Sequence, residues 1–291
     1  MKSHVLMGIL AWWVCCHALS AAAQSGLEAE LSQRPLDQVV RLARVLGDPT
    51  RGAILFHRQG LGCVQCHTAG EGARLLGPDL AALGERATYA HVIESLLEPS
   101  KVVQKGYQVE KLLLDDGQII SGLIRSESEE ELVIVVPGDE KPQTVSLDAI
   151  EARVPADSLM PLGLTNQLTD ETEFFDLVSF LVELGRAGPE SAAKWKPDPS
   201  LIEPPPLPEY ESDLDHAGMI VGWNAKSLKN GEALYQSLCI NCHGTREEAG
   251  SLPNALRFAT EKFKNGSDPY SMYKTLTHGY KMMLPQRQLV P

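Results

Sequence analysis

Cysteine is scarce in this chain: six are present among 291 residues. Two of them, Cys15 and Cys16, lie in an apolar stretch near the N-terminus, and the other four lie in two motifs of the pattern Cys-x-x-Cys-His. An exported protein that relies on disulfides usually distributes its cysteines through its loops. Because no cysteine after residue 16 lies outside the two motifs, we expect these motifs to carry chemistry rather than disulfides.

Positive charge is also in short supply. The chain has 26 Lys and Arg against 38 Asp and Glu, which gives a formal net charge of −12. Nucleic-acid binding depends on clustered Lys and Arg, so we exclude nucleic acid as a partner. The hydrophobic share of 43% and the charged share of 22% are those of an ordinary globular protein, and the length suffices for about two domains.

Long hydrophobic runs are missing as well. The apolar run from Val5 to Cys16 is shorter than the roughly 20 residues that a membrane span needs. Lys2 precedes this run, and the small residues Ala21–Ala23 follow it, as at a signal-peptidase site. We therefore predict a cleaved signal peptide over residues 1–23, with an uncleaved anchor as the alternative. The prediction implies a periplasmic or otherwise exported protein with no membrane span beyond that peptide.

The two motifs read "GCVQCHTAG" and "LCINCHGT". A zinc site commonly joins two Cys-x-x-Cys pairs about 15–20 residues apart, and each motif here lacks a nearby second pair. A redox dithiol does not require the adjacent His. Covalent haem attachment does require this order, because two thiols add to the haem vinyl groups and the His then binds the iron. We favour haem c over zinc, and zinc over a dithiol. The predicted sites are Cys63, Cys66 and His67 for one haem c and Cys239, Cys242 and His243 for a second.

The chain leading into each motif forms an internal repeat. The stretches "RGAILFHRQGLGCVQCH" and "NGEALYQSLCINCH" share a Gly, then a Leu-aromatic pair, then the motif. In the first repeat, Asp48 and Pro49 are typical of the N-cap and first residue of a helix. We expect each half to begin with a helix that leads into its cysteine motif.

Both halves resemble class I c-type cytochrome domains. The first half also resembles a haem-binding domain type of planctomycete and verrucomicrobial bacteria, through "LLGPDLAALGERATYAHVIESLLEPSKVVQKGYQ" and "SLMPLGLTNQLTDETEFFDLVSFLVELG". The stretch "FKNGSDPYSMYKTLTHGY" resembles a terminal haem module of larger exported proteins. The resemblance implies a mainly α fold with two helical haem domains, over residues 48–186 and 215–291. A Pro-rich, largely extended linker over residues 187–214 would join them.

Methionines are candidates for the sixth iron ligand. Met160, in "SLMPLG", is the only methionine between Ala23 and Met219, and Met-Pro before a final helix matches the cytochrome pattern. His91 is the rival ligand in that half. In the second half either Met282 or Met283 of "KMMLPQ" is expected to bind iron, with His278 as a weaker rival.

The resemblance also implies residues that support the haem. Pro78, in "GPDL", matches the position whose carbonyl accepts a hydrogen bond from the proximal His, here His67. In the second half the candidate is Pro253. Arg86 lies where such domains often hold a haem propionate, and a solvated surface arginine is the equal alternative.

Two further elements are expected in the first half. Residues 107–154 contain short apolar runs separated by the turn signals "DDGQ" and "PGDEKPQ", which predict a small antiparallel β insertion of about four strands. After Met160, either Thr169 or Asp170 can cap a terminal helix that packs across the first one. Its apolar positions are Phe174, Leu177, Val178 and Leu181.

These observations favour a dihaem cytochrome that passes single electrons between redox partner proteins, such as a dehydrogenase or a terminal oxidase. The chain is then a carrier rather than an enzyme. The alternatives are a dihaem peroxidase-like enzyme and a haem-based sensor module. Because the sequence stops at Pro291, soon after the second methionine pair, we also expect the second domain to lack its closing helix and to be loosely packed.

Overall fold

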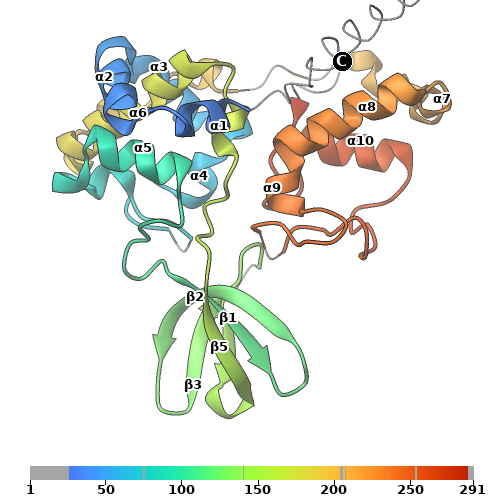
Figure 1. Ribbon diagram of the computed structural model, residues 1–291, viewed down its shortest axis with the longest axis horizontal. Coiled ribbons are helices and arrows are strands. Elements are labelled where there is room, and N and C mark those ends of the chain that lie inside the picture. The colour runs from blue at the N-terminus through green and yellow to red at the C-terminus, as the bar shows by residue number, and fades with distance from the viewer. Residues whose placement is uncertain are drawn as a thin grey trace, which may run out of the picture.

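The computed structural model describes residues 26–74, 76–139, 141–203, 206, 208–252 and 254–287. Two helical lobes lie side by side, with a β-sheet below them in the view of Figure 1. We call helices α1 to α6 the N-lobe and residues 208–287 the C-lobe. The predicted signal peptide, residues 1–23, lies outside the described residues.

The N-lobe is built from helices and short 3-10 turns. Its longer helices are α1 (Leu27–Ser32), α2 (Leu36–Leu46), α3 (Pro49–His57), α5 (Tyr89–Leu97) and α6 (Glu171–Ala187). Its short elements are η1 (Gln59–Leu61), α4 (Cys63–Cys66), η2 (Leu80–Ala82), η3 (Gly84–Arg86) and η5 (Leu164–Gln167). Both predicted helix starts are confirmed, because the carboxylates of Asp48 and Asp170 accept hydrogen bonds from the first backbone amides of α3 and α6.

Helices α3 and α6 cross closely. Gly52 permits this approach, because a Cβ there would overlap the backbone carbonyl of Asp176. The buried carboxylate of Asp176 accepts two hydrogen bonds from the Arg51 guanidinium, at 2.7 and 2.8 Å, and a third from the Asp48 amide. The predicted packing of the terminal helix across the first one is therefore confirmed, and an ion pair between the half-exposed Arg51 and the buried Asp176 joins the two helices where they cross.

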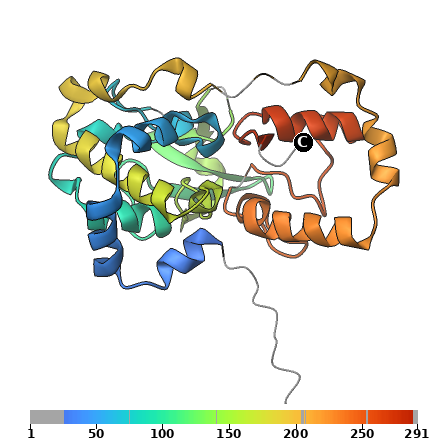
Figure 2. The ribbon, with the colours of Figure 1, turned by 90° about the horizontal axis from the view of Figure 1, so that it is seen from above.

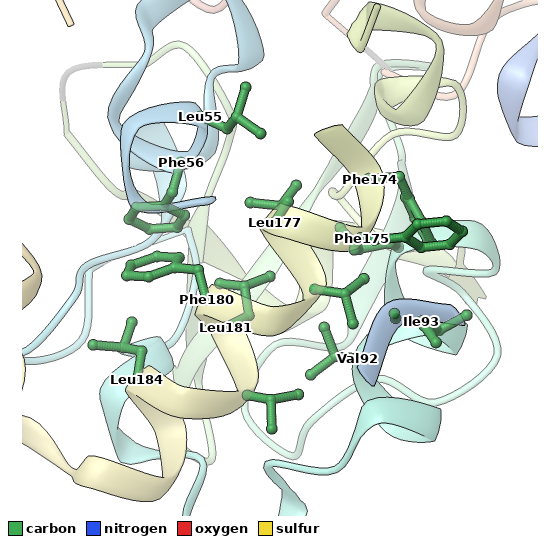
Figure 3. Packing of buried hydrophobic residues seen from close by; sticks show 14 of the residues in the cluster. Leu55, Phe56, Val92, Ile93, Phe174, Phe175, Leu177, Phe180, Leu181 and Leu184 are labelled. Atoms are coloured by element: carbon green, nitrogen blue, oxygen red, sulfur yellow. The ribbon is translucent and has the colours of Figure 1, made fainter. Parts of the chain in front are cut away.

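One hydrophobic core fills the N-lobe. Phe56 of α3 faces Phe180 of α6 with ring centroids 5.4 Å apart, and both rings are buried (Figure 3). Val92 and Ile93 of α5 complete this side of the core. Burying side chains of this size contributes about 1.5–3 kcal/mol each, so the core holds the first cysteine motif on a rigid base. The predicted apolar positions of α6 are all buried: Phe174, Leu177, Val178 and Leu181.

The predicted β insertion is present as one antiparallel sheet with five strands rather than about four. The strands are β1 (Val109–Leu114), β2 (Ile119–Glu127), β3 (Glu131–Val135), β4 (Gln143–Ser146) and β5 (Ile150–Ala156). Their order in the sheet is β4-β3-β2-β1-β5. The chain is therefore a mixed structure of helices and one sheet, and the expectation of a mainly α fold understated the strands.

The segment expected to be an extended linker is partly folded. Its described residues form the 3-10 helices η6 (Pro189–Trp195), η7 (Pro199–Leu201) and η8 (Glu209–Asp213). Trp195 packs edge-on against Phe180, with centroids 6.1 Å apart. The start of the segment is thus packed against α6, because Trp195 and Ala192 supply apolar surface that a free linker would leave in water.

The C-lobe carries helices α7 (His216–Val221), α8 (Ala225–Leu234), α9 (Ile240–His243) and α10 (Pro269–His278), with a π-helical turn η9 (Tyr235–Cys239). Figure 2 shows it beside the N-lobe. Among its described residues no hydrophobic side chain is buried, whereas Phe258, Phe263 and Leu276 are exposed. Its helices surround no protein core of their own.

Across the described residues, no helix has the length and hydropathy needed to cross a bilayer.

Candidate functional site

The first cysteine motif lies at the end of the repeat that begins with α3. Gly62 adopts a left-handed conformation with φ of 69° and turns the chain from η1 into α4, the single helical turn that carries Cys63 and Cys66. Both thiols are free. Burial raises the pKa of Cys63 to about 12 and also raises that of Cys66, so both are neutral thiols in this fold. Cys63 and Val64 pack at the edge of the N-lobe core.

His67 follows α4 directly, and its ring is held by one hydrogen bond. Nδ1 lies 3.0 Å from the backbone carbonyl oxygen of Pro78, the contact that the sequence analysis expected. Because a carbonyl can only accept, Nδ1 carries the proton and Nε2 keeps its lone pair for a metal. Burial lowers the pKa of His67, which favours this neutral ring. Gly77 allows the loop to come close, since a Cβ there would lie 2.9 Å from Nδ1.

Asp79 organises the loop that presents Pro78, and the sequence analysis did not single it out. Its buried carboxylate accepts hydrogen bonds from the amides of Gly70, Gly72 and Ala81 at 2.8 to 3.0 Å. The amide of Leu80 in turn donates to the carbonyl of Thr68. The sequence did contain a signal for this role: Asp79 directly follows Pro78, and an Asp in a loop often accepts hydrogen bonds from nearby backbone amides.

Met160 lies at the edge of the same core as Cys63 and is partly buried against it. The preceding residue, Leu159, is buried in a smaller cluster with Leu76 and Tyr107 and so anchors the methionine loop to the sheet. The rival ligand His91 is half-buried on α5. The first cysteine motif and Met160 thus both pack against the hydrophobic core of the N-lobe.

Two arginines lie near this site in different environments. Arg86 is exposed, donates to Gln104 at 3.0 Å, and lines a hollow of about 570 Å³ together with Pro78 and Asp79. Arg125 lies at a bulge in β2 and stacks over the Tyr107 ring, 5.1 Å from its centroid. The Nε and Nη2 atoms of Arg125 are buried and have no hydrogen-bond partner. Sequence reasoning missed Arg125, because only the fold brings this strand beside the loop.

A chain of contacts connects Arg125 to the cysteine motif. Tyr107 donates to the carbonyl of Arg74 at 3.4 Å, and Arg74 donates to the carbonyl of Val64 at 2.7 Å. Val64 lies between the two cysteines of the first motif. The buried Nε and Nη2 atoms of Arg125 therefore lie in the neighbourhood of this motif.

The second motif repeats the arrangement of the first. The Nδ1 atom of His243 lies 2.8 Å from the backbone carbonyl of Leu256, and the ring stacks on Phe258 with centroids 4.7 Å apart. Pro253, the residue expected to supply this carbonyl, lies outside the described residues. The acceptor that the structure describes is Leu256, 13 residues after His243, whereas Pro78 lies 11 residues after His67. Burial raises the pKa of Cys242 to about 11.

The second methionine pair lies in a tight loop after α10. Tyr280 and Met283 form an isolated bridge, and Lys281 between them has a φ of 54°. Met282 and Met283 are both half-buried. His278 directs Nδ1 to the carbonyl of Lys274 within α10 and is exposed. The loop is closed by two backbone hydrogen bonds between Tyr280 and Met283, at 2.9 and 3.1 Å.

Residues 226–291 match the sequence model of a family described as "Cytochrome C oxidase, cbb3-type, subunit III". The C-terminal region contains a cytochrome c domain. A search of the curated proteins finds no match. In this cytochrome c domain, Cys239 and Cys242 form the Cys-x-x-Cys motif for one haem c, which indicates electron transfer.

Haem fits the residues at both motifs. Each offers two neutral thiols, a histidine with its lone pair on Nε2, and buried polar atoms that lack partners: Arg125 Nε and Nη2 near the first motif, and Arg257 Nε and Ser251 Oγ near the second. Haem would also supply apolar surface to the cytochrome c domain, whose described residues bury no hydrophobic side chain. Among the described residues, no group of three or more His, Cys, Asp and Glu side chains is arranged to hold a metal ion.

Proposed function

We propose that this protein is an exported dihaem c-type cytochrome that passes single electrons between redox partners. The proposal adds to the cytochrome c domain a second haem unit, residues 48–186, with the sheet as its insertion. Residues 187–214 connect it to the C-terminal unit, residues 215–291. One observation carries the proposal: in both motifs the histidine Nδ1 donates to a backbone carbonyl, 11 residues further along at His67 and 13 at His243.

The matching hydrogen bonds matter because they do two things at once. They fix the ring tautomer that leaves Nε2 able to bind iron, and they orient each ring against the turn that carries the thiols. A motif that arose by chance has no reason to hold its histidine in this way. The family match covers only the second motif, so the first motif gains its support from this geometry.

Each residue has a defined part in the proposal. The four thiols of Cys63, Cys66, Cys239 and Cys242 would hold haem covalently, and His67 and His243 would each bind an iron. Met160 would supply a second ligand to the first iron, and Met282 or Met283 would supply one to the second. When bound, haem supplies one-electron redox chemistry at its iron, and thioether ligation favours the ferrous state.

The propionates of the first haem are proposed to meet two arginines. Arg125 would donate hydrogen bonds from Nε and Nη2 to the buried carboxylate, because these two atoms have no acceptor within the protein. Arg86 would bind the carboxylate nearer to solvent, since it lines the open hollow beside Pro78. An anion held by Arg125 would give partners to Nε and Nη2, whereas Nη1 already donates to the Gly106 carbonyl at 3.2 Å.

The proposed partners are redox proteins. The matching family is described as an oxidase subunit, which favours a terminal oxidase as electron acceptor, with a dehydrogenase as the other candidate. Export to the periplasm or beyond is proposed from the N-terminal residues 1–23, and covalent attachment of haem c agrees with it.

The test is a count of covalent haems. The full chain is expressed with a haem-attachment system, and its mass and pyridine haemochrome are measured. We expect two haem additions, with Cys63→Ala/Cys66→Ala losing one and Cys239→Ala/Cys242→Ala losing the other. A full chain that carries one haem, and keeps it in the Cys63→Ala/Cys66→Ala variant, contradicts the proposal for the first half.

A further inference from the structure

The two lobes meet at the ends that carry the cysteine motifs. In Figure 1, α4 lies on the side of the N-lobe that faces the C-lobe, and α9 lies on the side of the C-lobe that faces the N-lobe. A hollow of about 320 Å³ lies between α4 and the second methionine loop, lined by Val64 and Gln65 on one side and by Gly279, Met283 and other residues of that loop on the other. The first motif therefore lies beside the second methionine loop in space, although more than 200 residues separate them in the sequence.

Three glycines before residue 187 allow the C-lobe to pack closely against the rest of the chain. At Gly62 a Cβ would overlap Leu284, at Gly163 it would overlap the side-chain amide of Asn241, and at Gly138 it would lie 2.7 Å from Asn254 Nδ2. All three glycines have positive φ, between 69° and 85°. In each case a C-lobe side chain occupies the space where any residue except glycine would carry its Cβ.

The contacts are reciprocal. Gly62 directly precedes Cys63 of the first motif, and it touches Leu284, which directly follows Met283 in the second methionine loop. Asn241 lies inside the second motif, and it touches Gly163, three residues after Met160. Each cysteine turn thus lies against the methionine loop of the other lobe, as two copies of one unit would across a pseudo-twofold axis.

The sheet adds a clamp to this arrangement. The turn between β3 and β4 reaches the C-lobe, where Asn254 Nδ2 donates to the carbonyl of Pro137 at 2.5 Å. The side chain of Met282 lies 3.8 Å from the Cβ position of Gly138 in the same turn. The insertion therefore contacts the loop that offers the second iron its methionine, and this gives the sheet a role in fixing one lobe against the other.

We propose that this reciprocal contact is a route for direct electron transfer between the two haem sites. The inference rests on the proposed function, since it needs both haems. Thioether bonds would hold each haem at its cysteine turn, so turns that touch the opposite lobe would place both haems near the same interface. In the step, one electron leaves the reduced site and the oxidised site gains it. No bond forms or breaks, and no proton moves.

Asn241→Arg is the variant that tests the route. It keeps the Cys-x-x-Cys-His pattern, because only the residue between the cysteines changes, and its longer side chain cannot fit against Gly163. Asn230→Arg is the matched control, since it makes the same change at an exposed position of α8 in the same lobe. Asn254→Asp is a second, milder variant, because it replaces the donor to the Pro137 carbonyl with an acceptor of equal size.

The measurement is the redistribution of one electron within the full, doubly loaded chain after pulse reduction. We expect a phase whose rate does not depend on protein concentration in the native protein and in Asn230→Arg. That phase is lost in Asn241→Arg and slowed in Asn254→Asp, while the haem count and the two absorption spectra stay unchanged. Small-angle scattering of Asn241→Arg should show a larger radius of gyration.

Two results overturn the inference. One is a native chain with two haems whose electron redistribution scales with protein concentration, because exchange then occurs between molecules. The other is a concentration-independent phase that survives in Asn241→Arg despite separated lobes. A chain that carries only one haem instead fails the proposed function, and the mass measured on the same sample distinguishes the two failures.

Discussion

His243 donates a 2.8 Å hydrogen bond from Nδ1 to the backbone carbonyl of Leu256. The same ring atom of His67 meets the carbonyl of Pro78 at 3.0 Å. Proline has no amide hydrogen, whereas leucine does, so the common element is the acceptor carbonyl rather than the residue type. The loops that deliver these carbonyls differ in length and composition, yet both set the ring for a ligand on Nε2.

Met160→Ala tests the distal ligand of the first haem. We expect loss of the thioether-to-iron absorption band of that haem and a lower potential, because Met ligation favours ferrous iron. The spectrum and potential are measured on the Cys239→Ala/Cys242→Ala chain, which carries only the first haem. His91→Ala is the control and should leave both unchanged. A band that survives in Met160→Ala and disappears in His91→Ala would reverse the assignment.

Asp79→Ala tests the loop that holds Pro78. Three backbone amides lose their acceptor, so the N-lobe should lose about 1–3 kcal/mol in its free energy of unfolding. Exogenous imidazole should also bind more readily at the first haem, because His67 is less well oriented. Asp116→Ala removes an exposed carboxylate that accepts from one amide in a hairpin turn, and its cost should stay within about 0.5 kcal/mol. Equal costs for the two variants would show that the Asp79 network does not hold the loop.

Arg125→Gln and Arg86→Gln separate the two proposed propionate partners. Removal of a buried positive charge leaves the propionate charge uncompensated and favours ferric iron, so Arg125→Gln should lower the potential of the first haem. Arg86→Gln should lower it less, because solvent screens an exposed arginine. Redox titration followed at the first haem band gives both values. A larger shift for Arg86→Gln would place the buried carboxylate elsewhere.

Glu28 makes the stability of the N-lobe depend on pH. Burial raises the pKa of its carboxyl above the ordinary value of 4.5, although the amides of Gly163 and Thr165 act in the opposite direction. The folded chain therefore holds this proton more tightly than the unfolded chain. The contribution to stability is complete below pH 4.5 and is lost as the pH rises through the raised value.

Glu28→Gln removes this dependence, because the amide cannot ionise and its oxygen can still accept from the Gly163 amide. Urea unfolding of both proteins at a series of pH values is the measurement. The difference in the free energy of unfolding, variant minus native, should increase as the pH rises above 4.5. A difference that stays constant with pH would mean that Glu28 titrates as an exposed carboxylate does.

The sequence predicted those parts of the fold that depend on local signals. Asp48 and Asp170 cap helices because a carboxylate at that position meets free backbone amides whatever surrounds it. The strands of the insertion were expected because turn residues separate short apolar runs. The linker was misjudged because Trp195 folds back onto Phe180, a contact that proline content does not reveal.

The candidate site was predictable only in part, for the same reason. The spacing of the cysteines and histidines was enough to predict them as site residues. Pro78 was predicted from its place in a family pattern. Arg125 and Asp79 depend on which segments the fold brings together, and Leu256 depends on the path of a loop. Gly62 and Gly163 showed no signal at all, because a glycine that faces another lobe looks like any turn glycine in the sequence.

The described residues of the C-lobe bury no hydrophobic side chain, so the lobe would depend on a bound group for its apolar interior. A lobe that gains its apolar interior from a dissociable ligand is stabilised by mass action, so dilution of the ligand unfolds it. A group tied to Cys239 and Cys242 by covalent bonds has no free concentration to fall. Once attached, it would act as a permanent part of the lobe's interior, and the fold would persist under dilution, washing or competition that strip an ordinary cofactor from its protein.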